Sequence, residues 1–295
     1  MVSFSIPRSV RSLYRSDAGY HAVQTHYNRM LARYPVPYES RFVSTRYGDT
    51  HVIISGAQTA PPVVLVHGLG VHAMMWQPNI AALSRHFRVY ALDVIGDGGR
   101  SEAARPSMLD ASYAHWLADV LDVLRLPQAY LAGMSLGGWL ALNTALYYPQ
   151  RVCGLYLVAP AGLVTLNTSL LMQWLFSIMP TSRLNGLDTA TLLAKLTGTI
   201  DNDLSTMVQL ATAHHIPKRV PPVPIFSGDA LAQIQVPVTI VVGTADEMFS
   251  AARIHQRAGN LPAIQNVYIV DGAGHGINAT HADEVANHMI EQWSA

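Results

Sequence analysis

The stretch from residue 130 to residue 138 constrains the fold more than any other part of the sequence. Its apolar beginning predicts a strand, the motif Gly133-Met134-Ser135-Leu136-Gly137 follows, and helical spacing begins at once. In this strand–turn–helix setting the motif forms a sharp turn that presents its serine as a nucleophile. Glycine is required on both sides of Ser135, because a larger side chain would clash with the strand or the helix. A chance match is the alternative, since a chain with 21 glycines contains such patterns easily.

Short apolar strands alternate with helical segments along most of the chain. Strands buried on both faces of a parallel sheet are typically continuous apolar runs, and such runs predict buried strands at residues 63–66 and 154–158. Further strands are predicted at residues 88–92, 237–242 and 267–270. Helical spacing follows Pro78 and covers residues 110–124, with Asp110 or Ser112 as the cap, then 136–148 and 283–293. Residues 41–45 and 50–55 predict a β-hairpin. The alternation predicts an α/β fold with a mostly parallel, doubly wound sheet and helices on both faces.

The alternation of predicted strands and helices also divides the chain into parts. Residues 1–38, with helical spacing between Tyr20 and Tyr34, predict an N-terminal helical extension. Residues 39–161 and 235–295 predict the α/β core domain. Residues 162–234 break the alternation with helical apolar segments at 170–179, 187–196 and 204–213 and no convincing strand. We therefore expect residues 162–234 to form a helical cap, or lid, inserted into the core domain.

Composition narrows the class of protein. Half of the 295 residues are apolar, so a large core is possible. Lys plus Arg equals Asp plus Glu, at 19 each, which gives no electrostatic attraction to nucleic acid or to an anionic membrane. Cys153 is the only cysteine, so neither a disulfide within the chain nor a thiolate metal cluster is expected, and a buried inert thiol is favoured. Without an apolar region after the first arginines or a run approaching about 18 apolar residues, we expect no signal peptide, no membrane span and a cytoplasmic location.

Two later loops supply the groups that a serine nucleophile needs. A serine hydroxyl is weakly nucleophilic at neutral pH, so it requires a base, and the base requires a third group that fixes its tautomer. Asp246 follows the predicted strand 237–242, and His275 lies in a glycine-rich loop after the next strand. The chain order Ser135, Asp246, His275 is the one expected with this motif. All three residues follow strand ends, where ligands bind in open α/β sheets, so we predict that they form a catalytic triad.

Each of these residues has a rival. Asp246 could merely cap a turn, and Glu247 is a neighbouring carboxylate, but Asp246 falls at the strand exit. His275 competes with His281 and His288, which lie near or within the last predicted helix, where structural histidines are common. We therefore favour Asp246 and His275.

The pair His214-His215 in the predicted cap raises the possibility of a metal site. A metal needs further ligands, and neither an acidic residue nor another histidine is spaced near this pair. A helix-end or substrate-lining role is favoured instead. We therefore expect no metal and no cofactor.

A serine hydrolase also needs donors for the oxyanion of its tetrahedral intermediate. One predicted donor is the backbone N–H of Leu136, which begins the helix after Ser135. The other is the backbone N–H of Leu69, which follows His67-Gly68 after the strand 63–66. Each such donor is typically worth about 3–4 kcal/mol in the transition state.

Together these motifs resemble those of α/β-hydrolases of the carboxylesterase type, from about residue 41 to the C-terminus. The matching pieces are His67-Gly-Leu-Gly70 with Trp76 downstream, Asp93-Val-Ile-Gly-Asp-Gly-Gly-Arg-Ser101, Gly133-Met-Ser-Leu-Gly137, Asp246 and Gly274-His275. One departure is the loop after Asp93, which is usually Gly-x-Gly-x-Ser in this family and is one residue longer here. We interpret that loop as structural.

The resemblance implies an α/β-hydrolase fold and hydrolysis of carboxylic esters through an acyl-enzyme intermediate. We expect small to medium lipophilic ester substrates. The alternatives left open are a carbon–carbon hydrolase or lactonase with the same triad, and a slow-turnover ligand receptor of the same fold. A serine nucleophile disfavours dehalogenases and epoxide hydrolases, which carry Asp at that position. Substrate choice is expected to depend on the cap, with part of the apolar segment 170–179 lining the acyl site; the oligomeric state is left open.

Overall fold

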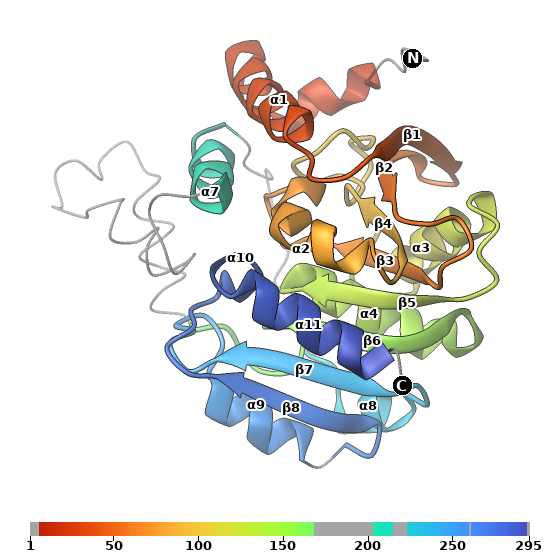
Figure 1. Cartoon of the computed structure of the whole chain (residues 1–295), viewed down its shortest axis with the longest axis vertical. Coiled ribbons are helices and arrows are strands. Elements are labelled where there is room, and N and C mark those ends of the chain that lie inside the picture. The colour runs from red at the N-terminus through yellow and green to blue at the C-terminus, as the bar shows by residue number, and fades with distance from the viewer. Residues whose placement is uncertain (1–5, 168–202, 215–222, 260, 294–295) are drawn as a thin grey trace, which may run out of the picture.

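The structure, a computed structural model, describes residues 6–167, 203–214, 223–259 and 261–293. At its centre lies one eight-stranded sheet in the order β1-β2-β4-β3-β5-β6-β7-β8 (Figure 1). The strands are β1 (Tyr38–Thr45), β2 (Gly48–Ser55), β3 (Pro62–Val66), β4 (Arg88–Leu92), β5 (Ala129–Met134), β6 (Val152–Val158), β7 (Val238–Gly243) and β8 (Ile264–Val270). The hairpin β1–β2 and the pair β2–β4 are antiparallel, and all other pairs are parallel. The predicted mostly parallel, doubly wound sheet is therefore confirmed.

Helices cover both faces of this sheet (Figure 1). One apolar layer packs α3 (Ser112–Val123), α4 (Leu136–Tyr147), α8 (Gly228–Ala232) and α9 (Ala251–Ala258) against the strands. The other layer contains α1 (Asp17–Ala32), α2 (Gln77–Leu83), α10 (Ile277–Thr280) and α11 (Ala282–Trp293), with the short η2 (Ala73–Trp76). Two further 3₁₀ turns are η1 (Arg8–Leu13) and η3 (Pro149–Arg151), and α7 (Asp203–His214) packs against α1.

Helix α3 shows how the pattern of apolar residues produced this packing. Tyr113, Trp116, Leu117 and Val120 recur at helical spacing, and all are buried against the sheet. The predicted cap was wrong, because the residue at the N-cap position is Ala111, whose side chain caps nothing. The Asp110 carboxylate accepts a hydrogen bond from the Ser112 N–H at 2.8 Å, so it forms a turn just before the helix.

Parts of the predicted cap fall within the described residues and parts do not. The predicted helix at 204–213 is present as α7, and α8 packs Leu231 into the core next to the sheet. The predicted helical segments 170–179 and 187–196 lie outside the described residues. Within the described residues, none of the helices combines the length and the apolar character that crossing a membrane requires.

Candidate active site

The turn between β5 and α4 holds Ser135 in an unusual backbone conformation. Its φ is 52° and its ψ is −114°, a strained combination for a residue with a side chain. The flanking glycines make the turn possible: a Cβ on Gly133 would lie 2.2 Å from the Gly137 carbonyl oxygen, and one on Gly137 would lie 2.1 Å from that of Val66. Only glycine permits β5, α4 and β3 to approach this closely.

Hydrogen bonds to the exit of the next strand stabilise the strained turn. The Ser135 N–H donates to the Val158 carbonyl at 2.9 Å, and the Ser135 carbonyl accepts from the Ala161 N–H at 3.0 Å. The serine is nearly buried. Among the described residues its hydroxyl forms no hydrogen bond, which leaves the oxygen available for a substrate carbonyl. Hydrogen bonds between nucleophile and base often form or tighten only when the substrate binds.

Asp246 and His275 are brought together as the sequence predicts. Asp246 follows β7 and His275 follows β8, and the aspartate Oδ2 lies 2.9 Å from the imidazole Nδ1. The other carboxylate oxygen, Oδ1, accepts the N–H groups of Met248 at 2.8 Å and Phe249 at 3.0 Å. A carboxylate only accepts hydrogen bonds, so this geometry assigns the imidazole proton to Nδ1 and leaves Nε2 as an acceptor. Both side chains are buried, which protects the pair from competing water.

The rival residues are engaged elsewhere. Glu247 is exposed, and its backbone carbonyl accepts from the Asn167 amide at 3.1 Å. His281 pairs its Nδ1 with the Thr280 hydroxyl at 2.9 Å. His288 contacts the hydroxyl of Tyr156 at 3.0 Å, and burial lowers its pKa. The hydrogen bond to Asp246 is therefore made by His275.

The loop after β3 lies beside Ser135. A Cβ on Gly68 would be 3.5 Å from the Ser135 Cβ, which places the predicted oxyanion loop against this serine. The Gly70 N–H donates to the Asp97 carboxylate, and the Gly68 N–H faces the Met75 sulfur at 3.3 Å. Among the described residues, the N–H of Leu69 between them has no acceptor. The N–H of Leu136 is also available, because the first turn of a helix has no partners within the helix.

A pocket is lined by both of these residues, Leu69 and Leu136. It is mainly apolar, with Asp97 and Arg105 as its charged members, and it is lined by Leu69, Val94, Gly96, Asp97, Arg105, Pro106, Met108, Tyr113, Leu136 and Val223. Most of these residues belong to the loops after β3 and β4 and to α3, so the described wall of the pocket comes from the core domain. This wall could not be predicted from the sequence, because its residues are scattered over more than 100 positions.

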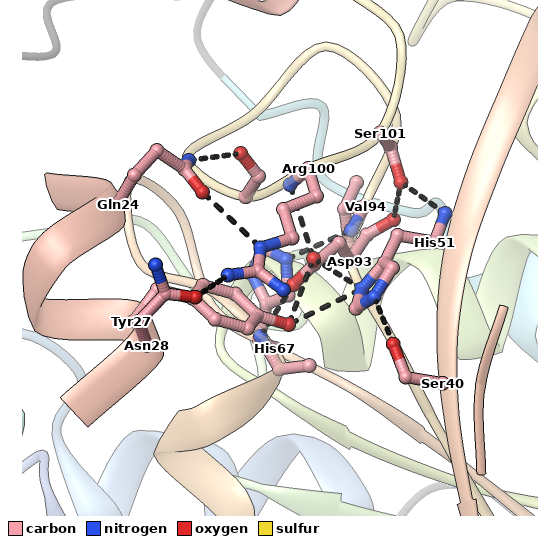
Figure 2. A network of polar contacts seen from close by, with 12 residues as sticks. Gln24, Tyr27, Asn28, Ser40, His51, His67, Asp93, Val94, Arg100 and Ser101 are labelled. Carbon is pink, nitrogen blue, oxygen red and sulfur yellow. Dashed lines mark hydrogen bonds and ion pairs between the residues drawn. The ribbon is translucent and has the colours of Figure 1, made fainter. Parts of the chain in front are cut away.

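A buried polar network centred on Asp93 holds the loop after β4 (Figure 2). Its Oδ2 accepts from the Tyr27 hydroxyl at 3.0 Å and the Arg100 N–H at 3.0 Å, and lies 2.9 Å from His51 Nδ1. Its Oδ1 accepts from the Ala73 N–H at 2.8 Å. Burial alone would raise the pKa of Asp93, but the hydrogen bond and charge of His51 hold that pKa below its usual value. Four segments of the chain meet at this one carboxylate: α1, β2, η2 and the loop after β4.

His67 links the same network to the oxyanion loop. Its Nε2 accepts the Val94 N–H at 2.8 Å, and its Nδ1 lies 2.7 Å from the Gly68 carbonyl (Figure 2). With both ring nitrogens hydrogen-bonded to backbone groups, this fully buried histidine ties the loop after β3 to the loop after β4. Its contribution to the motif is therefore structural.

The sequence raised two further groups, the His214-His215 pair and Cys153. No cluster of three or more His, Cys, Asp or Glu side chains suited to a metal occurs in the part of the chain that the structure describes. His214 ends α7, where its carbonyl accepts from the Arg15 N–H at 2.8 Å, and His215 lies outside the described residues. Cys153 is half-buried, and burial raises the pKa of its thiol, as expected of an unreactive cysteine.

Comparison with known proteins gives consistent matches. A family model described as the alpha/beta hydrolase family matches residues 63–288. The carboxylesterase YbfK of Bacillus subtilis (strain 168) is 32% identical over 276 residues, covering 90% of each chain. The uncharacterized carboxylesterase nap of the same organism is 44% identical over 146 residues, about half of either chain (50% of this one and 48% of that protein).

Solved structures agree with these sequence matches. The crystal structure of the YbfK carboxylesterase from Bacillus subtilis superposes with a TM-score of 0.81 at 29% identity, covering 93% of this chain and 98% of that one. The crystal structure of naproxen esterase from Bacillus subtilis gives a TM-score of 0.81 at 26% identity, with coverages of 94% and 99%. The similarity thus extends over nearly the whole length of both structures.

Proposed function

The chain belongs to the alpha/beta hydrolase family and is a carboxylic ester hydrolase, and we propose that Ser135, Asp246 and His275 are its catalytic triad. The observation that carries the proposal is the 2.9 Å contact of Asp246 with His275 at the same sheet edge as the strained Ser135 turn. This contact holds the imidazole in the tautomer that can accept a proton from serine.

The proposed reaction has two halves. The Ser135 oxygen attacks the ester carbonyl while His275 Nε2 takes the hydroxyl proton, and the N–H groups of Leu69 and Leu136 bind the resulting oxyanion. Collapse of the tetrahedral intermediate breaks the bond to the alcohol oxygen, which leaves with the proton from His275. Water then attacks the acyl-enzyme in the same way, giving the carboxylic acid and restoring Ser135.

The proposed substrates are small to medium lipophilic esters. The apolar side chains of Val94, Met108, Tyr113 and Val223 line the pocket next to the proposed oxyanion donors, which supports this size and polarity. A cap formed by residues 162–234 belongs to the same proposal. It is supported by α7, because a Cβ on Gly70 would lie 3.6 Å from the Ala211 Cβ, so this helix sits over the oxyanion loop. The proposed location is the cytoplasm, which cell fractionation would test.

The decisive experiment is the variant Ser135→Ala, assayed with p-nitrophenyl acetate and butyrate. We expect turnover to fall by a factor on the order of 10⁶ with folding unchanged, because a single hydroxyl is removed. Ser44→Ala, which removes an exposed hydroxyl on β1, is the matched control and should keep full activity. A Ser135→Ala enzyme with a tenth of the wild-type rate would show that another residue is the nucleophile.

The same assay separates the enzyme from the alternatives raised by the sequence. Steady-state turnover of p-nitrophenyl esters distinguishes an esterase from a slow-turnover receptor, which would release only one equivalent of product. Comparing acyl chains from two to about twelve carbons, and adding a lactone, tests the proposed substrate class. Turnover of the lactone above that of every linear ester would favour the lactonase alternative.

A further inference from the structure

We infer that Asp97 is a positioning residue that holds the loop carrying the Leu69 N–H in the geometry needed to bind the oxyanion. The inference rests on the proposed function, because it assigns a role to Leu69 in that reaction. Asp97 itself does not contact the reacting atoms. It acts through Gly70, the residue next to the proposed donor.

The carboxylate of Asp97 holds the backbone of the oxyanion loop directly. Both of its oxygens lie 3.0 Å from the Gly70 nitrogen, and Oδ1 also accepts the Gly98 N–H at 2.9 Å. The side chain is buried, so these charge-assisted hydrogen bonds compete little with water. Because the Gly70 N–H is directed at Asp97, the peptide between Leu69 and Gly70 cannot rotate freely. The next peptide, which carries the Leu69 N–H, has its Gly68 carbonyl 2.7 Å from His67 Nδ1, so Asp97 and His67 hold Leu69 from its two sides.

Glycines bring the loop that carries Asp97 into this contact. A Cβ on Gly98 would lie 2.6 Å from the Gly70 carbonyl oxygen, and one on Gly99 would lie 2.4 Å from the Asp93 Cγ. This is the loop that is one residue longer than the usual family pattern. The longer loop packs between Asp93 and Gly70, so the departure noted in the sequence falls on the segment that supports the oxyanion loop.

The N-terminal helix fixes the other end of the same loop. Arg100 donates from its backbone N–H to Asp93 at 3.0 Å and from Nε to the Gln24 side chain at 3.1 Å (Figure 2). Its guanidinium lies 4.0 Å from the centre of the Tyr27 ring, within the range of a cation–π contact. Residues of α1 thus fix the position of Arg100, and Arg100 in turn fixes the loop after β4. Asp97, in the same loop, binds the Gly70 N–H and so restricts its movement.

The negative charge of Asp97 makes the inference testable, because it has an opposing effect. Asp97 lines the same pocket as Leu69 and Leu136, where a negative charge repels a developing oxyanion. If repulsion were the larger effect, removing the charge would accelerate the reaction. If positioning is the larger effect, removing the acceptor slows it.

The experiment compares Asp97→Ala, Asp97→Asn and the control Asp119→Asn, using p-nitrophenyl butyrate. Asp119, which lies on α3, is a suitable control because its carboxylate also accepts a backbone N–H, that of Arg46 at 2.9 Å. For Asp97→Ala we expect kcat to fall about 10- to 100-fold with KM changed less than about two-fold, since misplacing an oxyanion donor affects the transition state. Asp97→Asn keeps an oxygen that can accept the Gly70 N–H, so it should recover most of the rate but remain below wild type.

A second measurement, the affinity of an inhibitor, tests the role of Asp97 without relying on turnover. A trifluoromethyl ketone forms a tetrahedral adduct with the serine, and its oxyanion should bind the Leu69 and Leu136 N–H groups. Its affinity should fall by the same factor as kcat in each Asp97 variant and stay unchanged in Asp119→Asn. If Asp97→Ala fails to fold, the inhibitor affinity of Asp97→Asn decides alone: a decrease supports the inference, and an unchanged or higher affinity contradicts it.

Three results would overturn the inference: kcat of a folded Asp97→Ala within two-fold of wild type, a loss confined to KM, or an Asp97→Asn enzyme faster than wild type. These outcomes differ from failure of the proposed function itself. That failure would appear as activity remaining in Ser135→Ala, whatever the Asp97 variants do.

Discussion

At the scale of single residues, the buried carboxylates differ in the groups that they accept. Asp246 uses one oxygen for two backbone N–H groups and directs the other at an imidazole. Asp97 directs both oxygens at a backbone N–H, and Asp93 accepts from a hydroxyl and two backbone N–H groups besides its contact with His51. Asp97 and Asp93 therefore hold loops, whereas Asp246 orients the imidazole of the proposed base.

The difference between Asp246 and its neighbour Glu247 can be measured. Asp246→Asn should keep the shape of the site but remove the charge that selects the Nδ1–H tautomer, so kcat should fall by a factor of about 10⁴. Glu247→Gln changes an exposed side chain and should stay close to wild type. Steady-state kinetics on one ester compares the two variants, and equal losses in both would contradict the proposed triad.

At the scale of secondary-structure elements, the site depends on close packing of β3, β5 and α4. Gly133 and Gly137 allow backbone atoms of these elements to lie where a Cβ would otherwise be, and the strained Ser135 lies between them. The packing also explains why Ser135 could be predicted from the sequence. Two glycines, an apolar strand and a helical pattern are local features, and each is needed for the same turn.

The variant Gly137→Ala tests this packing. Its Cβ would lie 2.1 Å from the Val66 carbonyl oxygen and 2.8 Å from that of His67, and backbone atoms cannot yield without moving β3 or α4. We expect the free energy of unfolding to fall by about 1–3 kcal/mol and ester hydrolysis to be largely lost. Gly228→Ala in α8 is the control, because a Cβ there meets nothing within 4 Å. Urea denaturation should show it at least as stable as wild type, and equal stability of both variants would rule out the steric explanation.

Other elements were less visible in the sequence. The core strands were found because they are continuous apolar runs, and α3 and α11 because they carry long apolar stripes. By contrast, α9 buries only Ile254 and Ala258, and α10 has four residues, so neither has a clear pattern. The strand β8 begins at Ile264, three residues before the predicted start, because it lies at the sheet edge and its first residues are partly exposed. Asp97 was not identified because its role depends on a contact with Gly70, which is distant in sequence.

At the scale of the whole molecule, the Asp93 network joins the N-terminal helix to the core. Tyr27 from α1, His51 from β2 and Arg100 from the loop after β4 meet at one buried carboxylate (Figure 2). His72 lies against Tyr27, with ring centres 4.5 Å apart, and is almost fully buried. Burial lowers the pKa of His72 to about 3, so the folded protein keeps this ring neutral.

This buried histidine predicts a pH dependence of stability. The folded pKa lies below the value of about 6.5 in an unfolded chain, so as pH falls below about 6.5 the unfolded state takes up the proton first. Stability from neutral His72 is therefore complete above about pH 6.5 and decreases as pH falls toward 3, by about 2 kcal/mol between pH 7.5 and 5. His26 and His288, whose pKa values burial also lowers, act in the same direction. The pKa of Asp93 is also lowered, but its contribution is lost only below about pH 4.

The measurement is urea denaturation at pH 7.5 and pH 5 for wild type, His72→Gln and His86→Gln. Glutamine does not titrate, so His72→Gln should lose about 2 kcal/mol less stability than wild type between the two pH values. His86 is exposed, and its variant should follow wild type. Identical pH dependence in all three proteins would show that His72 does not carry the effect.

The order of strands has a consequence for how an active chain emerges from the ribosome. From β5 onward, each new parallel strand pairs with one already synthesised: β5 with β3, β6 with β5, β7 with β6 and β8 with β7. The nucleophile turn and the oxyanion loop can therefore assemble on the first half of the sheet. His275 follows about 140 residues after Ser135, which at 5–20 residues per second is roughly 7–30 s of translation. During that interval the nascent chain carries the proposed nucleophile without its proposed base, so we expect ester cleavage to begin only after the last strand has been made.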